Sequence, residues 1–326
     1  MPCYPSIPDR SNRTGVPMSP QTDAILEKCR LLKPVRTAVV HPSKANVLEA
    51  VDEAVRAGLI EPVLVGPRAK TEAAAAEAGI SIGAWPVIDT EHSHAAAGKA
   101  AELAAEKHVD AIMKGSLHTD ELLGAIVGAD SGLRTARRIS HAYLMSIATY
   151  PKPFIITDAA VNILPDLAIK ADIVQNAVDL WRVLFGDAAP PKVAILAAVE
   201  TINAKMPATL DAAALCKMTD RGQITGCLMD GPLAFDNAIS AAAAEEKGIV
   251  SVVAGNADIL VVPDIEAGNM LAKQLTFLSG AEAAGIVLGA RVPVILTSRA
   301  DGERTRLLSC ALAVLLADAR KRGRIK

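Results

Sequence analysis

The sequence contains few aromatic residues, with two Trp, three Tyr and four Phe among 326 positions. A surface that binds single-stranded nucleic acid needs aromatic side chains for stacking, so their scarcity argues against such a surface. Positive charge is not in excess either, because 34 Lys and Arg stand against 36 Asp and Glu. The near balance removes the basic field that attracts nucleic acid, and we expect no nucleic-acid partner.

Long apolar runs are also missing. Even Leu307–Ala317 ends at Asp318, well short of the roughly 18 residues that a membrane span requires. The five cysteines are odd in number and form no C-x-x-C pair, so neither a disulfide framework nor a zinc site is indicated. Residues 1–20 hold five prolines and no apolar block, which predicts a flexible tail and no secretory signal. We therefore expect a cytoplasmic protein without a membrane anchor.

Several common site motifs are absent. The sequence has no G-x-G-x-x-G, Walker loop, H-E-x-x-H or G-x-S-x-G, which removes the commonest dinucleotide, NTPase, zinc-protease and esterase interpretations. Acidic residues follow three strand-like runs, at Asp158, Asp230 and Asp264, without the spacing of metal ligands. We expect most of them to cap the following helices, and no metal is predicted.

From Thr37 onward, short β-branched runs alternate with Ala-rich segments of helical periodicity. This alternation predicts a mainly parallel sheet covered by helices on both faces, and the length suggests two domains. The prolines around Pro151 mark the expected domain boundary, which places a second domain over residues 151–296. The predicted strands are Thr37–His41, Pro62–Val65, Val109–Met113, Phe154–Thr157, Val193–Ala197, Ile224–Met229, Ile259–Val262 and Val292–Thr297, and the predicted helices include Ala45–Ala57, Lys70–Ala78 and Glu303–Arg320.

Ligands of parallel α/β sheets sit beyond the carboxyl ends of the strands, so the residues directly after each strand are informative. One predicted strand ends in Lys114, Gly115 and Ser116, and a helix is expected to begin near Thr119. A glycine that permits close backbone approach, free helix N–H groups and a lysine together favour a phosphate. A plain helix cap after a strand is the alternative.

Two further segments carry polar groups of the same kind. Arg134, Arg137 and Arg138 lie close to Ser140, and forked guanidinium groups match phosphate oxygens, although a solvated charged face is the usual reason for such a run. A later strand ends in Ser298, Arg299 and Asp301. There Ser298 offers a hydrogen bond, Arg299 a counter-charge for a phosphoryl group, and Asp301 a proton acceptor or a partner for Arg299.

These motifs resemble the phosphate acetyltransferase and phosphate butyryltransferase family. The resemblance spans roughly Thr37 to Ala317. It rests on Lys114-Gly115 with Leu117-His118-Thr119, on Gly132-Leu133-Arg134-Thr135 with Ser140-His141, on Pro263-Asp264-Ile265-Glu266-Ala267-Gly268-Asn269-Met270-Leu271, and on Thr297-Ser298-Arg299-Ala300-Asp301.

The resemblance implies an acyl exchange between coenzyme A and inorganic phosphate by direct thiolate attack in a ternary complex. It also implies a homodimer without a cofactor, two α/β/α domains of the isocitrate/isopropylmalate dehydrogenase type, and a chain that returns to its first domain, residues 21–150 plus 297–326. Ser298 and Arg299 match the family's catalytic pair. Lys114, Gly115, Ser116, Arg134, Arg137, Ser140 and Asp301 are the candidate substrate-binding residues.

Two positions depart from the family pattern. Thr305 stands where some acetyl-specific members have an aspartate, and Gly124 lies near where many members have an arginine. We expect an acetyl group as the substrate, with propionyl or butyryl as the alternative. A non-catalytic module that senses acyl-coenzyme A remains the rival from another class, and a metal-dependent dehydrogenase of related fold would need aspartates that the sequence does not group.

Overall fold

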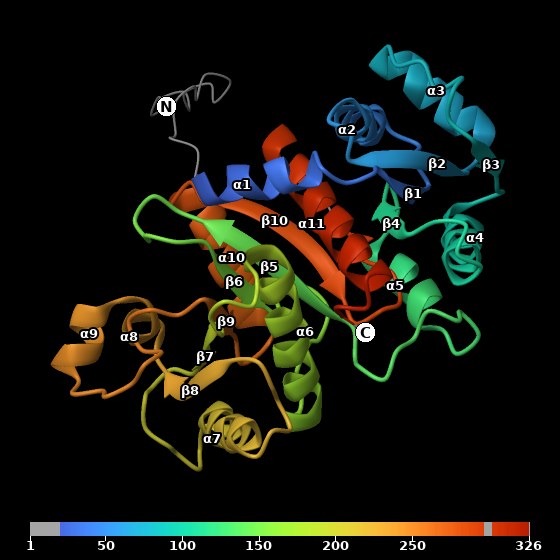
Figure 1. Cartoon of the computed structure of the whole chain (residues 1–326). Coiled ribbons are helices and arrows are strands. Elements are labelled where there is room, and N and C mark those ends of the chain that lie inside the picture. Colours follow the sequence, from blue (N-terminus) through green and yellow to red (C-terminus); the bar gives the residue numbers. More distant parts are fainter. Residues whose placement is uncertain (1–19, 297–301, 326) are drawn as a thin grey trace, which may run out of the picture.

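The computed structural model describes residues 20–296 and 302–325. In this part of the chain one eleven-stranded sheet has the order β3-β2-β1-β4-β11-β10-β5-β6-β9-β7-β8 and runs through the whole molecule (Figure 1). The strands are β1 (Val35–Val40), β2 (Ile60–Gly66), β3 (Val87–Asp89), β4 (Ala111–Lys114), β5 (Ser140–Ser146), β6 (Phe154–Thr157), β7 (Lys192–Leu196), β8 (Leu228–Leu233), β9 (Ile259–Val261), β10 (Glu282–Leu288) and β11 (Val294–Ile295).

Helices lie on both faces of the sheet. They are α1 (Pro20–Cys29), α2 (Ala45–Arg56), α3 (Arg68–Ala78), α4 (Ser93–Ala105), α5 (Thr119–Val127), α6 (Leu167–Phe185), α7 (Pro207–Asp220), α8 (Phe235–Ile239), α9 (Ala241–Glu246), α10 (Ile265–Leu278) and α11 (Glu303–Lys321). The predicted α/β class and the mostly parallel sheet are confirmed. No helix of the described segments combines the length and the apolar character that a membrane span needs.

The sheet consists of two parallel blocks joined by antiparallel strands. β3, β2, β1, β4 and β11 run parallel on one side, and β6, β9, β7 and β8 on the other. Between them, β5 pairs antiparallel with both β10 and β6. The sequence analysis did not foresee β5 and β10, because their register depends on pairing across about 140 residues, as between His141 and Val287.

Most predicted elements agree with the structure to within a few residues, and one strand does not. β6 and the start of α11 at Glu303 fall where the sequence predicts them. The predicted strand Ile224–Met229 is wrong in position, since β8 begins at Leu228. Ile224 is buried in the core outside the sheet. Its apolar character therefore reflects burial in a turn and not a strand.

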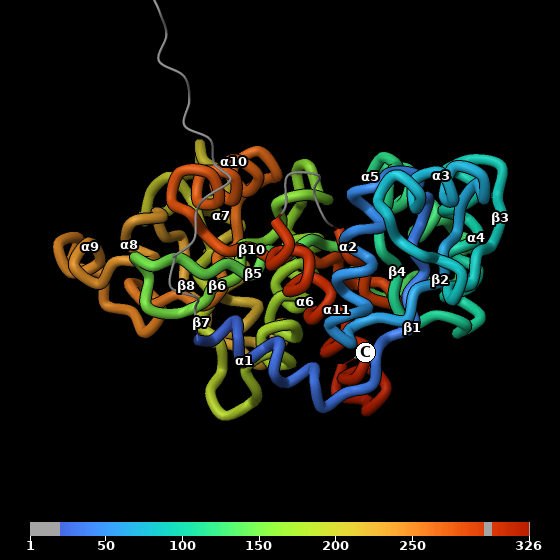
Figure 2. Tube along the Cα trace, turned by 90° about the horizontal axis from the view of Figure 1, so that it is seen from above, coloured from blue at the N-terminus to red at the C-terminus, as the bar shows by residue number. Residues whose placement is uncertain are grey.

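The two faces of the sheet are packed differently. One face carries a single continuous apolar cluster, to which α1, α2, α3, α6, α7 and α11 contribute. On the opposite face the buried residues fall into two clusters, one under α4 and α5 and the other under α8 and α10. Figure 2 shows α6 and α11 in the middle of the molecule, between these two groups of elements.

The last helix, α11, packs on elements from both halves of the chain. The sequence predicts that α11 needs a partner surface on the first half of the chain, and α11 does pack on α2 and β1, but it also contacts α6 and β10. Its first turns are fixed by ion pairs of Arg304 with Asp23 and Glu282, and of Arg306 with Glu53. These ion pairs thus anchor the first turns of α11, which follow residues 297–301, to elements from both halves of the chain.

Candidate active site

The face with two separate apolar clusters has a polar centre on β5 and β10. Side chains alternate along a strand, and because Ala142 and Leu144 belong to the continuous core, His141 and Tyr143 lie on the divided face. Gly285 of β10 is the ladder partner of Tyr143. The polar centre therefore lies between the two clusters, in the middle of the sheet.

His141 is the buried centre of this region. Its side chain is 1% exposed, and the ring packs edge-to-face on Tyr143 with centroids 4.3 Å apart. Burial lowers the pKa of His141 to about 3, so the imidazole is neutral at physiological pH. A Cβ at Gly285 would lie 2.9 Å from Nε2 and 3.2 Å from the carbonyl oxygen of Leu296. Glycine at 285 therefore makes room for the ring directly beside the start of the segment 297–301.

The end of β4 carries three of the predicted binding residues. Nζ of Lys114 donates to the carbonyl of Leu117 at 3.2 Å. A Cβ at Gly115 would lie 2.2 Å from the carbonyl oxygen of Val40, so this glycine is required by backbone packing against the end of β1. Oγ of Ser116 is buried and has no hydrogen-bond partner among the described residues.

The helix after β4 offers little attraction to an anion. α5 begins at Thr119, as the sequence predicts, but Asp120 and Glu121 occupy its first turn. Their carboxylates oppose the positive end of the helix dipole. A phosphate at this strand end would therefore depend on Lys114 and not on the helix N-terminus.

His41 is a polar residue of this region that the sequence analysis did not single out. It directly follows β1, has φ +53° and lies with Nδ1 3.1 Å from the carbonyl oxygen of Ser116. A left-handed backbone is unfavourable for a residue other than glycine, and such positions concentrate near functional sites. The signal that the sequence offered for His41 was its position at the end of an apolar strand.

The arginine segment 134–138 lies beside a pocket of about 620 Å³. Arg134 forms an isolated β-bridge with Ala290, and the side chains of Arg134 and Arg138 are exposed. Asn162 and Asp172 line the same pocket. With three arginines and one carboxylate among its lining residues, the pocket carries a net positive charge.

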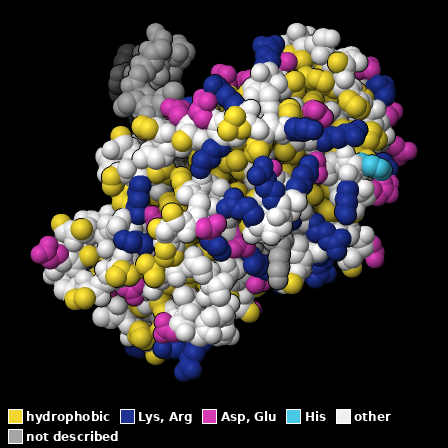
Figure 3. All heavy atoms as spheres, viewed as in Figure 1, with side chains coloured by type: hydrophobic (Ala, Val, Ile, Leu, Met, Phe, Trp, Pro, Cys, Tyr) yellow, Lys and Arg dark blue, Asp and Glu magenta, His cyan; other side chains and the backbone are white. Residues whose placement is uncertain are grey.

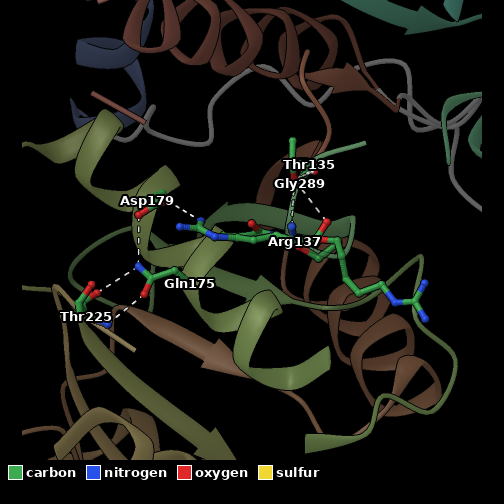
Figure 4. Close-up of polar contacts among 9 residues, drawn as sticks. Thr135, Arg137, Gln175, Asp179, Thr225 and Gly289 are labelled. Atoms are coloured by element: carbon green, nitrogen blue, oxygen red, sulfur yellow. Dashed lines mark hydrogen bonds and ion pairs between the residues drawn. The ribbon is translucent and has the colours of Figure 1, made fainter. Parts of the chain in front are cut away.

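Arg137 differs from its two neighbours because it has a structural partner. Its Nη1 donates to Oδ2 of Asp179 on α6 at 2.6 Å, and both side chains are partly buried. Thr135 fixes the same segment by donating to the carbonyl of Gly289 at 2.6 Å. Figure 4 shows the guanidinium of Arg137 directed toward Asp179, which also accepts from Gln175. The ion pair orients the segment that presents Arg134 and Arg138.

Ser140 is fully buried at the start of β5. Its Oγ accepts a hydrogen bond of 2.9 Å from Nδ2 of Asn176 on α6. The same amide donates to the carbonyl of Arg138. These contacts make Ser140 part of the packing between the sheet and α6, on the face opposite to His141.

Asp158 organises the turn that follows β6. Its carboxylate accepts hydrogen bonds from the backbone N–H groups of Ala160, Val161 and Asn162 and from Nδ2 of Asn162. Burial nevertheless outweighs these contacts and raises the pKa of Asp158. Nδ2 of Asn162 also donates to the carbonyl of Ile139, so this turn is tied to the arginine segment.

The acidic residue Asp264 has the role that the sequence predicts for most of these acids. It is the N-cap of α10, where its Oδ1 accepts from the N–H of Ala267 at 2.9 Å. Asp158 caps a turn, and no helix begins directly after it. Among the described residues, no three His, Cys, Asp or Glu side chains are grouped as metal ligands.

Ser298, Arg299 and Asp301 lie outside the described residues. The flanking elements define where their segment starts and ends. β11, which precedes it, lies between β4 and β10, and α11 follows it from Glu303. Ile295, the last residue of β11, thus pairs with Met113 of β4 on one side and with Ile286 of β10 on the other.

A sequence model of the phosphate acetyl/butaryl transferase family matches residues 91–314, more than half of the chain. The chain belongs to this family. A phosphate acetyltransferase of Rickettsia felis is 62% identical over 282 residues, which cover 86% of this chain and 80% of that protein. A phosphate butyryltransferase of Clostridium acetobutylicum is 41% identical over 293 residues, covering 90% and 97%.

The family assignment agrees with the fold. The crystal structure of a branched-chain phosphotransacylase from Enterococcus faecalis matches with a TM-score of 0.75 and 28% identity, over 87% of this chain and 99% of that one. The chain is therefore an acyltransferase enzyme. The matched range includes the β4 end, the arginine segment, Asp158 and residues 297–301, whereas His41 precedes it.

The two departures from the family pattern have simple surroundings. Thr305 is in the first turns of α11, where its carbonyl accepts from Oγ of Ser309 at 2.9 Å. Gly124 lies within α5, and a Cβ there would have no neighbour within 4 Å. A side chain at 124 is thus sterically allowed.

Proposed function

We propose that this enzyme transfers an acetyl group reversibly between coenzyme A and inorganic phosphate. The observation that carries the proposal is the pocket beside Arg134 and Arg138, whose lining residues have a net positive charge. Two anionic substrates must be held together, and such a pocket reduces their repulsion. The 62% identity to a phosphate acetyltransferase favours acetyl over longer acyl groups.

In the direction of thioester synthesis, the thiolate of coenzyme A attacks the carbonyl carbon of acetyl phosphate. The C–S bond forms, the bond between the carbonyl carbon and the phosphoryl oxygen breaks, and phosphate leaves with the electron pair. We assign Arg299 to the phosphoryl group and Ser298 to the developing oxyanion or the thiol. Lys114 and Arg134 would bind further anionic oxygens, and Asp301 would orient Arg299.

The remaining candidates hold the neighbouring backbone in place. Arg137 and Ser140 are engaged with Asp179 and Asn176, so we propose that they position the arginine segment. Gly115 and Ser116 would hold the β4 end against His41. No base is assigned, because Thr305 carries no carboxylate and a thiol with a pKa of about 8.5 is partly ionised near neutrality.

We propose further that residues 21–150 with 297–326 and residues 151–296 act as two domains of the isocitrate dehydrogenase type, with the substrate cleft between them. The separation of the apolar clusters on one face supports this division. We propose a homodimer, as the family resemblance implies. We expect a cytoplasmic enzyme that uses no cofactor or metal.

The acyl specificity is tested by comparing kcat/KM for acetyl, propionyl and butyryl phosphate with coenzyme A, followed through thioester absorbance. We expect acetyl phosphate to be the best substrate. A preference for butyryl phosphate would make the chain a phosphate butyryltransferase. Turnover with none of the three would favour the module that senses acyl-coenzyme A.

A further inference from the structure

A second, smaller pocket lies behind the arginine segment, between α6 and α11. Its volume is about 90 Å³, and its lining includes Arg137, Asp179 and Arg320. Thr135, Arg137 and Gly289 line both this pocket and the larger one. The arginine segment therefore lies between the two pockets, and Figure 4 shows Arg137 directed toward Asp179, which lines the smaller one.

The charges in this pocket do not cancel. Its lining residues include two guanidinium groups and one carboxylate. The carboxylate of Asp179 is already occupied, because Oδ2 accepts from Arg137 and Oδ1 from Gln175. Arg320 has no hydrogen bond or ion pair within residues 20–296 and 302–325. Arg320 is partly buried, and the carboxylate that attracts it, Asp179, is already paired with Arg137. The pocket therefore keeps one uncompensated positive charge and attracts a monoanion.

Arg320 keeps its charge near neutral pH. Burial, together with the neighbouring charge of Arg137, lowers the pKa of Arg320 to about 10. Arg320 lies near the C-terminal end of α11, a favourable location for a cation. Its charge is therefore available to a ligand in the pocket.

Size and wall chemistry limit the ligand. At roughly 10–15 Å³ for each water, a pocket of this volume holds about six to nine waters or one small molecule. The rest of the lining includes an apolar wall, formed by the side chains of Leu180, Leu288, Leu316 and Ile325. A nucleotide is too large, and an anion without an apolar part leaves this wall without a partner.

The pocket shares two lining residues with a neighbouring groove. Asp179 and Ile325 also line this groove of about 250 Å³. Within it, Arg182 and Arg324 both pair with Asp187. Figure 3 shows many Lys and Arg side chains in the middle of this face, around the end of α11. The groove itself is balanced in charge, because two arginines and two aspartates line it, so the net positive charge lies in the smaller pocket.

We propose that this pocket is a binding site for a short-chain monocarboxylate. The carboxylate oxygens accept hydrogen bonds from the guanidinium of Arg320, and the alkyl end packs on Leu180, Leu316 and Ile325. The site is distinct from the acyl-transfer site, from which the arginine segment separates it.

Calorimetric titration of the purified whole chain with acetate, propionate and butyrate tests the proposal without any turnover. Affinity should rise with chain length, and Arg320→Met should weaken butyrate binding about tenfold or more, because a charge-assisted hydrogen bond is lost. Arg322→Met is the matched control, since Arg322 is the exposed C-cap residue of α11 and pairs with Asp318; it should bind butyrate like the wild type.

A second variant tests the apolar wall and does not depend on Arg320. Ile325→Ser should weaken butyrate several-fold and acetate little. Equal butyrate binding by the wild type and Arg320→Met would overturn the proposal, since any binding would then be at another site. Tighter, Arg320-dependent binding of inorganic phosphate than of butyrate would also overturn it, by making the pocket a phosphate site.

Discussion

The two faces of the central sheet differ in one property, the continuity of their apolar packing. On one face a single cluster extends from α1 to α11 across both parallel blocks. On the other face the buried residues form two separate clusters, and the polar His141 lies at the centre of the sheet beside Tyr143 and Gly285. The continuous face supplies the burial that stabilises the whole sheet, so the divided face is free to carry polar groups at its centre. Stability and chemistry should therefore respond to different substitutions.

The largest loss of stability is expected on the continuous face. Leu312 of α11 is fully buried there, and Leu312→Ala should lower the free energy of unfolding by about 2–5 kcal/mol through lost burial and a cavity. Chemical denaturation measures this loss. The activity of each folded molecule should be unchanged, and a stability loss below about 1 kcal/mol would contradict the role given to this face.

Arg299→Ala should give the opposite result. Loss of a charge-assisted contact to the phosphoryl group is expected to reduce kcat/KM about 10²–10³-fold, while the free energy of unfolding stays within about 0.5 kcal/mol. Steady-state kinetics and denaturation measured on one preparation test both parts. Near-normal turnover would remove Arg299 from the site.

Two glycines, one directly after β4 and one within α5, allow a matched test of how closely the backbone packs at the end of β4. Gly115→Ala should lower the free energy of unfolding by about 1–3 kcal/mol, because its Cβ would overlap the carbonyl of Val40. Gly124→Ala is the control, with open space around its Cβ, and should stabilise α5 by up to about 1 kcal/mol. If both variants are equally stable, the close approach at Gly115 is not a constraint.

His141 predicts a pH dependence. Its pKa of about 3 in the folded protein is below the ordinary value of 6.5, so the unfolded chain binds more protons between these pH values. Its contribution to stability is present above pH 6.5 and is lost as pH falls toward 3, by up to about 1.4 kcal/mol per pH unit. Denaturation across this range should show a shallower slope for His141→Gln.

The exposed His108 provides the control for this measurement. His108→Gln should leave the slope of the wild type unchanged. An identical slope in the wild type and His141→Gln would show that His141 does not titrate as its burial predicts.

Thr305→Ala should have the smallest effect. Thr305 contributes its backbone carbonyl to Ser309, and alanine keeps that carbonyl. We expect kcat/KM to change less than about twofold and stability by less than about 0.5 kcal/mol. A strong decrease in rate would mean that the Thr305 hydroxyl takes part in the reaction.

The sequence predicts the elements better than their pairing. A short apolar run placed β6 and helical periodicity placed α11, because both are local patterns of the sequence. It did not reveal β5, whose polar Ser140 and His141 conceal a buried strand, or its antiparallel pairing with β10. That pairing is non-local and leaves no periodic signal.

The sequence showed which types of residue could form the site, but it did not show which side chains contact one another. Arg134 and Arg137 are equivalent in sequence, but only Arg137 meets Asp179, 42 positions away on α6. Ser140 similarly meets Asn176, 36 positions away. These contacts depend on the packing of α6, so they could not be inferred before the fold was known.

The most direct test of the account is a crystal structure of this protein with coenzyme A and phosphate bound. It should place the phosphate within hydrogen-bond distance of Arg299, at the divided centre of the sheet and beside the pocket of Arg134. Coenzyme A bound elsewhere, or Arg299 paired with structural carboxylates away from any ligand, would contradict the proposed site.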